Sequence, residues 1–262
     1  MTAILAAILT ISGLGLIFGL GLAFGSRIFA VFIDPRLEKI EELLPHLNCG
    51  ACGYGGCADC ARALLDGKAE PSVCPVATPE CQREIAELVG KLLEEEEQTT
   101  ARIFCQGGYD AARRYLYEGI KTCAAANQIG GGVTACDYGC LRYYTCRDVC
   151  PFGAIEIDER GNPVVNPDLC RSCGLCVSHC PRSLIRIVPK KSEVDIRCSS
   201  RARGKTVVQV CSVGCIACGK CVRECPVSAI TLEDNLAKID YDLCVNCGKC
   251  IEACPRNIIS RV

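Results

Sequence analysis

The chain has 262 residues, enough for two or three small domains, and its formal net charge of −1 gives no argument for binding nucleic acid. Its 26 cysteines, against six phenylalanines and no tryptophan, predict a thin apolar core to which bound metal adds folding free energy. In a secreted protein this cysteine density would indicate disulfides, but the spacings described below argue for reduced thiols and a cytoplasmic location.

Residues 3–25 contain no charged residue and predict a membrane-spanning helix. At about 1.5 Å per residue such a helix is roughly 35 Å long, enough to cross the hydrocarbon core of a bilayer. A cleaved signal peptide needs a basic segment ahead of its apolar one, and no charge precedes Thr2, so we expect a retained anchor. The first cations, Arg27, Arg36 and Lys39, follow the span. They predict a single span in the cell membrane, with the rest of the chain on the cytoplasmic side.

A compact group of cysteines follows a short predicted helix that begins at Asp34-Pro35 and ends at Pro45. Three cysteines have the spacing C-x2-C-x4-C, and the glycines between them let the backbone wrap tightly. We expect the nearby Cys60 and Cys81 to be buried as small hydrophobic side chains. The predicted ligands of a separate [4Fe-4S] site are Cys49, Cys52, Cys57 and Cys74.

An amphipathic helix is predicted over residues 83–97, and residues 98–100 indicate a linker. These elements predict a transmembrane anchor at 1–27 and an N-terminal [4Fe-4S] domain at 28–97. Two further modules are predicted at 98–188 and 189–262, and their cysteine runs indicate a ferredoxin-like fold.

Three complete runs of the pattern C-x2-C-x2-C-x3-C-P begin at Cys170, Cys215 and Cys244. A fourth, altered run ends at Cys146-x3-Cys150-Pro151. In bacterial ferredoxins three cysteines of such a run hold one [4Fe-4S] cluster, and the cysteine before proline binds the neighbouring cluster. Zinc sites rarely use this pattern, so the tandem runs favour iron–sulfur ligation over zinc or disulfides.

The cysteines also repeat along the chain, which predicts a duplicated two-cluster module. Five of them, beginning at Cys123, recur 75 residues later, so that Cys123 would correspond to Cys198. The run from Cys170 recurs 74 residues later from Cys244.

Short apolar segments between the runs predict one β-hairpin in each copy: Ile155–Ile157 with Val164–Val165, and Ile230–Leu232 with Lys238–Ile239. The predicted fold class is therefore a small α+β protein. It would consist of an N-terminal transmembrane helix, a small helical [4Fe-4S] domain and a tandem duplication of a bacterial two-[4Fe-4S] ferredoxin-like fold.

The first copy departs from the pattern at Tyr143, which stands where the second copy has Cys218. Its cluster therefore lacks one thiolate. Cys136, four residues ahead of the altered run, is the first candidate to replace it, before Cys105 and Cys123. The predicted ligand sets of the two modules are Cys136, Cys140, Cys146 and Cys180; Cys150, Cys170, Cys173 and Cys176; Cys215, Cys218, Cys221 and Cys254; and Cys225, Cys244, Cys247 and Cys250. With the N-terminal site, the sequence predicts five [4Fe-4S] clusters.

The cysteines left over near these runs are Cys105, Cys123, Cys198 and Cys211. Unclaimed cysteines in a cytoplasmic chain are more often ligands or redox groups than disulfides. A sixth cluster shared between the copies is therefore left open, and it would raise the iron content from about 20 to about 24 per chain.

Four features together resemble the B subunit of the Rnf complex, the ion-translocating ferredoxin:NAD oxidoreductase. They are the anchor at 3–25, the CGACGYGGC motif at 49–57 with Cys74-Pro75, the ACDYGC stretch at 135–140 and the ferredoxin runs. The resemblance covers nearly the whole chain, and the second module marks a longer form of the family.

The resemblance implies a subunit that takes electrons from reduced ferredoxin and relays them into a membrane complex. Other subunits of such complexes hold flavin and the NAD site, and the electron flow drives Na+ or H+ across the membrane. This chain alone would be an electron carrier without a catalytic residue. Two alternatives stay open: a membrane-anchored polyferredoxin subunit of another complex, such as a hydrogenase or dehydrogenase, and a non-redox zinc scaffold.

The segment between the two modules is basic and predicts a docking surface for an acidic ferredoxin. An ordinary solvated surface is the alternative. The cations are Lys190, Lys191, Arg197, Arg201, Arg203 and Lys205, interrupted only by Glu193 and Asp195.

Overall fold

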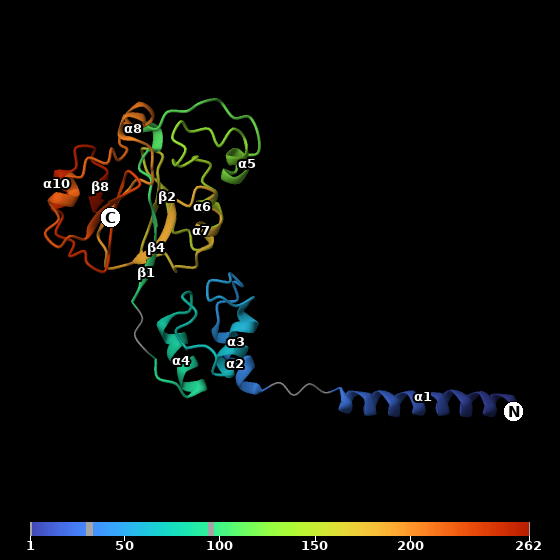
Figure 1. The fold of residues 1–262 in the computed structure, drawn as a ribbon. Coiled ribbons are helices and arrows are strands. Elements are labelled where there is room, and N and C mark those ends of the chain that lie inside the picture. The colour runs from blue at the N-terminus through green and yellow to red at the C-terminus, as the bar shows by residue number, and fades with distance from the viewer. Residues whose placement is uncertain (1, 30–33, 94–96, 262) are drawn as a thin grey trace.

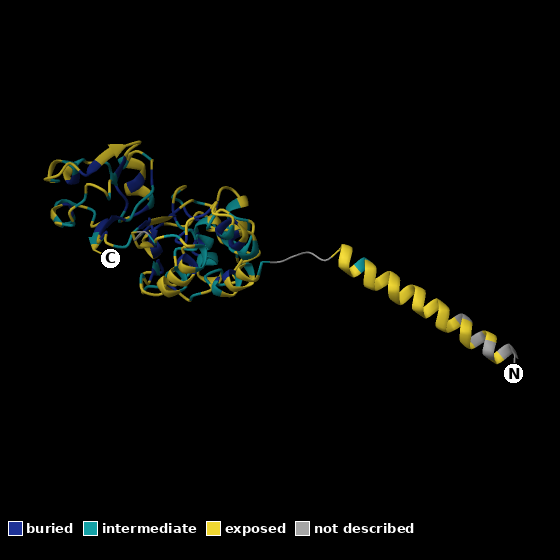
Figure 2. Cartoon of the chain, turned by 90° about the horizontal axis from the view of Figure 1, so that it is seen from below, coloured by how far each residue is buried: buried dark blue, intermediate teal, exposed yellow. Residues whose placement is uncertain are grey.

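The computed structural model describes residues 2–29, 34–93 and 97–261 (Figure 1). It begins with α1 (Thr2–Ile28), whose described residues are exposed except for the half-buried Gly25 (Figure 2). Its segment Ile11–Ile28 has a mean hydropathy of 1.6 and is long enough to cross a membrane. A long apolar helix without protein packed around it fits a lipid environment better than water.

Three helices form the N-terminal domain: α2 (Pro35–Leu43), α3 (Cys57–Leu65) and α4 (Pro79–Val89). The side chains of Asp34 and Thr78 cap α2 and α4 by accepting backbone N–H groups, and a proline follows each cap. The helices bury Ile40, Leu64 and Ile85 in one core, which holds the cysteine-rich loop before α3 in place.

The helix predicted over residues 83–97 is wrong at both ends. It begins at Pro79, and it ends at Val89 because Gly90 adopts a left-handed conformation with a φ of 69°. Residues 94–96 lie outside the described residues, and Glu97 forms an ion pair with Lys191 at 2.7 Å.

The first ferredoxin copy is built from two antiparallel strand pairs with short helices between them. β1 (Thr99–Ile103) pairs with β4 (Ile185–Pro189), and β2 (Ile155–Ile157) pairs with β3 (Pro163–Val165) as the predicted hairpin. The strands are separated by η1 (Gly108–Asp110), α5 (Cys123–Gln128), α6 (Thr145–Asp148) and α7 (Leu175–Ser178).

The second copy repeats this plan. β5 (Val194–Ile196) pairs with β8 (Ile259–Arg261), and β6 (Ile230–Glu233) pairs with β7 (Leu236–Ile239) as the second predicted hairpin. Its helices are α8 (Gly204–Val210), α9 (Lys220–Arg223) and α10 (Lys249–Ala253).

Both hairpins are thus confirmed, whereas the outer strand pairs were not predicted. The predicted linker at 98–100 is wrong at Thr99 and Thr100, which open β1, and Thr100 is fully buried. β4 ends one residue beyond the module boundary predicted at 188.

The two copies contact each other through β1 and β5. Arg102 in β1 forms a buried ion pair of 3.2 Å with Asp195 in β5. The backbone N–H of Gln106 donates to the carbonyl of Arg197 at 3.0 Å. The first copy also contacts the N-terminal domain, because Phe152 and Cys173 pack against the core of α2, α3 and α4.

Candidate iron–sulfur sites

The N-terminal cysteines gather around the loop that leads into α3. Cys57 opens this helix, and its N–H donates to the Asn48 side chain at 2.8 Å. Cys49, Cys52 and Cys57 pack against the core that contains the buried Cys74. Burial raises the pKa of the Cys74 thiol, and the neighbouring Cys52 and Cys49 thiols raise it further. The four predicted ligands therefore lie in one small region.

The two leftover cysteines of this domain behave differently. Cys60 is 1% exposed and lies on the buried face of α3, as predicted for a small hydrophobic side chain. Cys81 is half-buried on α4, where its sulfur accepts a hydrogen bond from the Thr78 hydroxyl at 3.1 Å.

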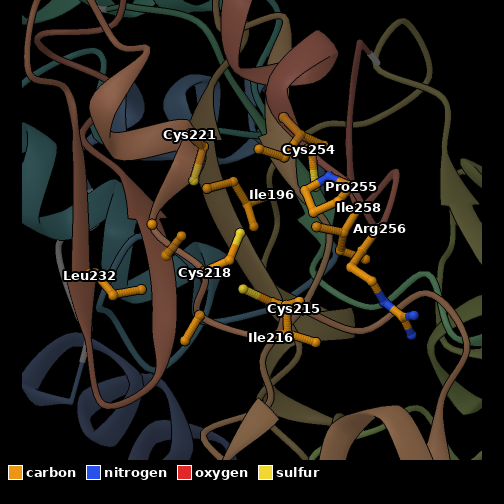
Figure 3. Close-up of a pocket in the computed structure, with 14 residues that line it drawn as sticks. Ile196, Cys215, Ile216, Cys218, Cys221, Leu232, Cys254, Pro255, Arg256 and Ile258 are labelled. Carbon is orange, nitrogen blue, oxygen red and sulfur yellow. The ribbon is translucent and has the colours of Figure 1, made fainter. Parts of the chain in front are cut away.

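In the second ferredoxin copy the two predicted ligand sets each line one cavity. Figure 3 shows the first cavity, whose apolar walls include Ile196 and Ile258. Its empty space of about 370 Å³ is partly open to solvent. Its cysteines are Cys215, Cys218, Cys221 and Cys254. The second cavity, of about 320 Å³, is lined by Cys225, Cys244, Cys247 and Cys250.

In the first copy one predicted set is brought together and the other is not. A cavity of about 340 Å³ is lined by Cys150, Cys170, Cys173 and Cys176, as expected. A further cavity of about 400 Å³ is lined by Cys123, Cys140, Cys146 and Cys180. Cys136, the first candidate for the fourth position, lies elsewhere, and Cys123, a weaker candidate, takes its place.

The physical reason is an insertion between β1 and the altered run. Thirty-one positions separate Cys105 from Cys136, but thirteen separate the equivalent Cys198 and Cys211, so the first copy carries eighteen additional residues. The longer segment includes α5, and Cys123 is the first residue of this helix. The N–H of Cys123 donates to the Thr145 hydroxyl at 2.9 Å, which holds this thiol beside α6 and Cys146.

The 75-residue match between Cys123 and Cys198 is consequently wrong. Cys105 and Cys198 each follow the end of a first strand by two residues, β1 and β5 respectively. The Sγ of Cys105 accepts the N–H of Cys140 at 3.4 Å, and the Sγ of Cys198 accepts the N–H of Cys215 at 3.4 Å. Cys105 is thus the structural counterpart of Cys198, and the numerical coincidence conceals the insertion.

The remaining four cysteines also line one cavity, of about 360 Å³, between the two copies: Cys105, Cys136, Cys198 and Cys211. None of these four cysteines belongs to a complete ferredoxin run.

The backbone of the ferredoxin loops is the same in all four runs. The residue before the second position is left-handed in each, with φ of 61° at Arg142, 52° at Ser172, 57° at Ala217 and 55° at Asn246. This conformation turns the loop around the cavity. Arg142 keeps it although Tyr143 follows in place of a cysteine, so the altered run lost a thiol and kept its shape.

Burial dominates the chemistry of these thiols. Burial, together with a smaller contribution from neighbouring thiols, raises the pKa of Cys146 and of Cys176 to about 12. Sulfur atoms at these sites accept backbone N–H groups, as Cys225 does from Ala229 at 3.3 Å and Cys180 from Leu184 at 3.4 Å. Bound iron would have to displace the thiol protons, and the N–H groups would then stabilise the thiolates.

The donor sets suit a cluster better than a single ion. In the described part of the chain no three His, Cys, Asp or Glu side chains lie close enough to hold one metal ion. Four sulfurs around a cavity are the donor set of a [4Fe-4S] cubane, so the residues fit that group.

Comparisons with known proteins agree with this chemistry. Residues 44–76 match a family described as "Putative Fe-S cluster". The family described as "4Fe-4S dicluster domain" matches at residues 133–184, 169–229 and 214–258.

Several similar proteins extend over almost the whole chain. The B subunit of the Na(+)-translocating ferredoxin:NAD(+) oxidoreductase complex of Acetobacterium woodii is 42% identical over 92% of this chain and 73% of its own length. A proton-translocating counterpart from Clostridium ljungdahlii is 38% identical over 93% and 86%. The B subunit of an ion-translocating oxidoreductase complex from Methanosarcina acetivorans is 38% identical over 90% of both chains.

Proposed function

This chain belongs to the B subunits of ion-translocating ferredoxin:NAD(+) oxidoreductase complexes, which are electron-transfer proteins, and we propose which of its cysteines hold [4Fe-4S] clusters. Four of the proposed sets are those of the N-terminal site and the three complete runs. The fifth differs from the sequence prediction in one residue. The proposed sets are Cys49, Cys52, Cys57 and Cys74; Cys123, Cys140, Cys146 and Cys180; Cys150, Cys170, Cys173 and Cys176; Cys215, Cys218, Cys221 and Cys254; and Cys225, Cys244, Cys247 and Cys250.

The observation that carries the proposal is the gathering of four cysteines around each cavity of the two ferredoxin copies. Bound [4Fe-4S] clusters supply one-electron redox chemistry. The chain supplies the thiolates, apolar walls that exclude water, and backbone N–H groups that donate to sulfur. We propose that it accepts electrons from reduced ferredoxin and hands them to flavin-containing subunits of the complex. The family assignment favours this role over a polyferredoxin of another complex.

The test is a metal and sulfide analysis of the full chain purified without oxygen, followed by titration with reduced ferredoxin. We expect iron and acid-labile sulfide in equal amounts, and visible absorbance that bleaches as ferredoxin is added. Zinc without sulfide would instead support the scaffold alternative, and unbleached iron–sulfur absorbance would contradict ferredoxin as the donor.

Only some cations of the basic stretch 190–205 are suitable for a ferredoxin docking surface. Lys190 pairs with Asp168 at 3.0 Å, and Lys191 pairs with Glu97 at 2.7 Å. Arg197 is largely withdrawn from solvent, and this burial lowers the pKa of its guanidinium. These three residues are therefore poor candidates for steering a partner.

Three exposed cations remain beside the start of α8: Arg203, Lys205 and Arg201, whose ion pair with Asp234 is long at 3.9 Å. A Cβ placed on Gly204 would lie 2.8 Å from the carbonyl oxygen of Ile216, so this segment touches the loop between Cys215 and Cys218. Cys218 is itself exposed. We propose that an acidic ferredoxin docks here, because cations next to an exposed ligand combine steering with short distance.

Reversing these three cations to glutamate should slow reduction by ferredoxin about tenfold or more at low salt. The defect should shrink as salt rises, because steering is screened beyond a Debye length of about 10 Å at 0.1 M. Stopped-flow absorbance measures the rate. A matched control reverses the exposed cations Lys39, Arg62 and Arg83 of the N-terminal domain. Equal rates for both triple variants and the parent at every salt concentration would assign docking to another face.

We further propose that α1 is a single span with the cluster-bearing part on the cytoplasmic side. The support is its apolar, exposed surface and the cations Arg27, Arg36 and Lys39 that follow it. We also propose the domain limits predicted from the sequence, with the end of the first ferredoxin-like module moved from residue 188 to residue 189, where β4 ends.

A further inference from the structure

The cavity between the two ferredoxin copies is lined by two cysteines from each. Cys105 and Cys136 come from the first copy, and their counterparts Cys198 and Cys211 come from the second. Its volume of about 360 Å³ lies within the range of the four ferredoxin cavities. Neither copy alone contains enough thiols for a cubane, so the duplication is what completes the set.

The four thiols line one cavity, and two glycines lie beside three of them. A Cβ on Gly107 would lie 3.7 Å from the Sγ of Cys105 and 3.6 Å from the Sγ of Cys211, so two sulfurs from different copies approach one glycine. A Cβ on Gly139 would lie 3.5 Å from the Sγ of Cys136. The glycines let the backbone approach the sulfurs closely, as it must around a bulky group.

Backbone N–H groups point at these sulfurs in the way they do at the ferredoxin sites. Cys198 accepts the N–H groups of Cys215 at 3.4 Å and Ser200 at 3.5 Å. Cys105 accepts the N–H of Cys140 at 3.4 Å. Such donors stabilise thiolates and set the potential of an iron–sulfur centre. If the four thiols stayed protonated and only packed against one another, these N–H groups would stabilise them little.

Two arginines provide positive charge beside the cavity. Arg197 lies on its wall, and Arg256 donates to the carbonyl of Cys211 at 2.9 Å. A cluster held by four thiolates is anionic, so cations next to it offset its charge in a site that is largely shielded from water.

The position of the cavity also distinguishes it. The backbone N–H of Cys140, a proposed ligand in the first copy, donates to the sulfur of Cys105. The backbone N–H of Cys215, a proposed ligand in the second copy, donates to the sulfur of Cys198. The cavity therefore lies directly between the two ferredoxin copies' own sites.

We propose that Cys105, Cys136, Cys198 and Cys211 bind a sixth [4Fe-4S] cluster that joins the two ferredoxin copies. This inference rests on the proposed function, because it assumes that the ferredoxin-type sites bind clusters. A single metal ion fits less well, since no three candidate ligands among the described residues converge closely enough to hold one.

The first experiment compares the full chain with a Cys198→Ser, Cys211→Ser variant, both purified without oxygen. We expect about 24 irons and as many sulfides in the parent and a loss of about four of each in the variant. The matched control is Cys81→Ser, which changes a half-buried cysteine outside every proposed site and should lose none. A parent with about 20 irons, or a double variant with undiminished iron, would overturn the sixth cluster and leave the other five in place. Zinc without sulfide in the parent would overturn the proposed function itself.

A second measurement does not depend on the variant folding. Alkylation of the native parent, mapped by mass spectrometry, should leave the four cysteines unmodified until iron is removed by a chelator, as it should for Cys170. Modification of the four before chelation, or their recovery as two disulfides, would contradict the site.

Discussion

At the scale of single residues, we propose that the first copy has exchanged one ligand for another. Tyr143 occupies the position of a thiol, and its ring packs edge-on against Tyr117 with centroids 5.6 Å apart. The replacement thiol of Cys123 arrives from the insertion and is held by Thr145. In the proposed set, the fourth thiol therefore comes from a different part of the chain.

Replacing Cys123 by serine should remove one ligand, so that about one to four irons are lost per chain. Alkylation mapping should then find Cys140 exposed to the reagent and Cys105 still protected. Cys136→Ser should give the reverse pattern. If Cys136→Ser deprotects Cys140 while Cys123→Ser does not, the original sequence prediction of Cys136 is the correct one.

A rescue variant sharpens this test. Adding Tyr143→Cys to Cys123→Ser should return the iron content to that of the parent, because Arg142 has a φ of 61° where the intact loop has 57° at Ala217. The control adds Tyr143→Ser in the same background and should not restore iron. If Tyr143→Cys does not restore iron in the Cys123→Ser background, the loop does not direct position 143 into the cavity.

At the scale of elements, β1 and β5 hold the two copies together through a buried ion pair. Arg102 and Asp195 have side chains 7% and 3% exposed, and Arg102 also donates to the carbonyl of Ser192 at 2.9 Å. The Tyr241 hydroxyl donates to Asp195 at 2.6 Å. Burial raises the pKa of Tyr241, which keeps its hydroxyl protonated as the donor.

Asp195→Asn should destabilise this contact by about 3–5 kcal/mol, because it leaves the buried Arg102 without its counter-charge. We expect a lower urea midpoint, measured by far-UV circular dichroism, and faster amide hydrogen exchange in β1 and β5. Asp234→Asn is the matched control, since Asp234 is exposed and lies 3.9 Å from Arg201. It should cost less than about 1 kcal/mol. Equal effects of both substitutions would contradict a role for burial.

At the scale of the whole molecule, the chain combines an apolar helix, a helical domain and two ferredoxin copies (Figure 1). The N-terminal domain meets the first copy near a proposed site, because Cys173 packs against the core that contains Cys74. The proposed N-terminal site therefore lies next to the proposed site of Cys173 in the first copy.

Deleting residues 1–33 should release the chain from the membrane fraction without changing its iron content, because α1 contributes no cysteine. Fractionation followed by iron analysis measures both properties. In spheroplasts the full chain should resist external protease, and in inverted vesicles it should be digested, if its domains are cytoplasmic. A truncated chain that stays in the membrane fraction would show that another part of the protein carries the attachment.

Much of this organisation was predictable from the sequence because the signals are local. The apolar stretch at 3–25, each short hairpin and each C-x2-C-x2-C-x3-C-P run is a signal contained in a short segment of the chain. The spacing of the cysteines indicates a loop that wraps around a cluster. The three complete runs consequently line their cavities with the expected thiols.

The tertiary structure alone decided what depends on long-range contacts. The pairing of β1 with β4 brings strands more than eighty positions apart into register, and this pairing makes Cys105 the counterpart of Cys198. Spacing counted along the chain predicted Cys136 for the altered site, whereas in the structure Cys123 lines that cavity. An insertion shifts residue numbers without shifting the strands that frame the site. Four cysteines outside any complete motif line one cavity because the two copies pack against each other. The distance between side chains across such an interface cannot be read from their separation in sequence.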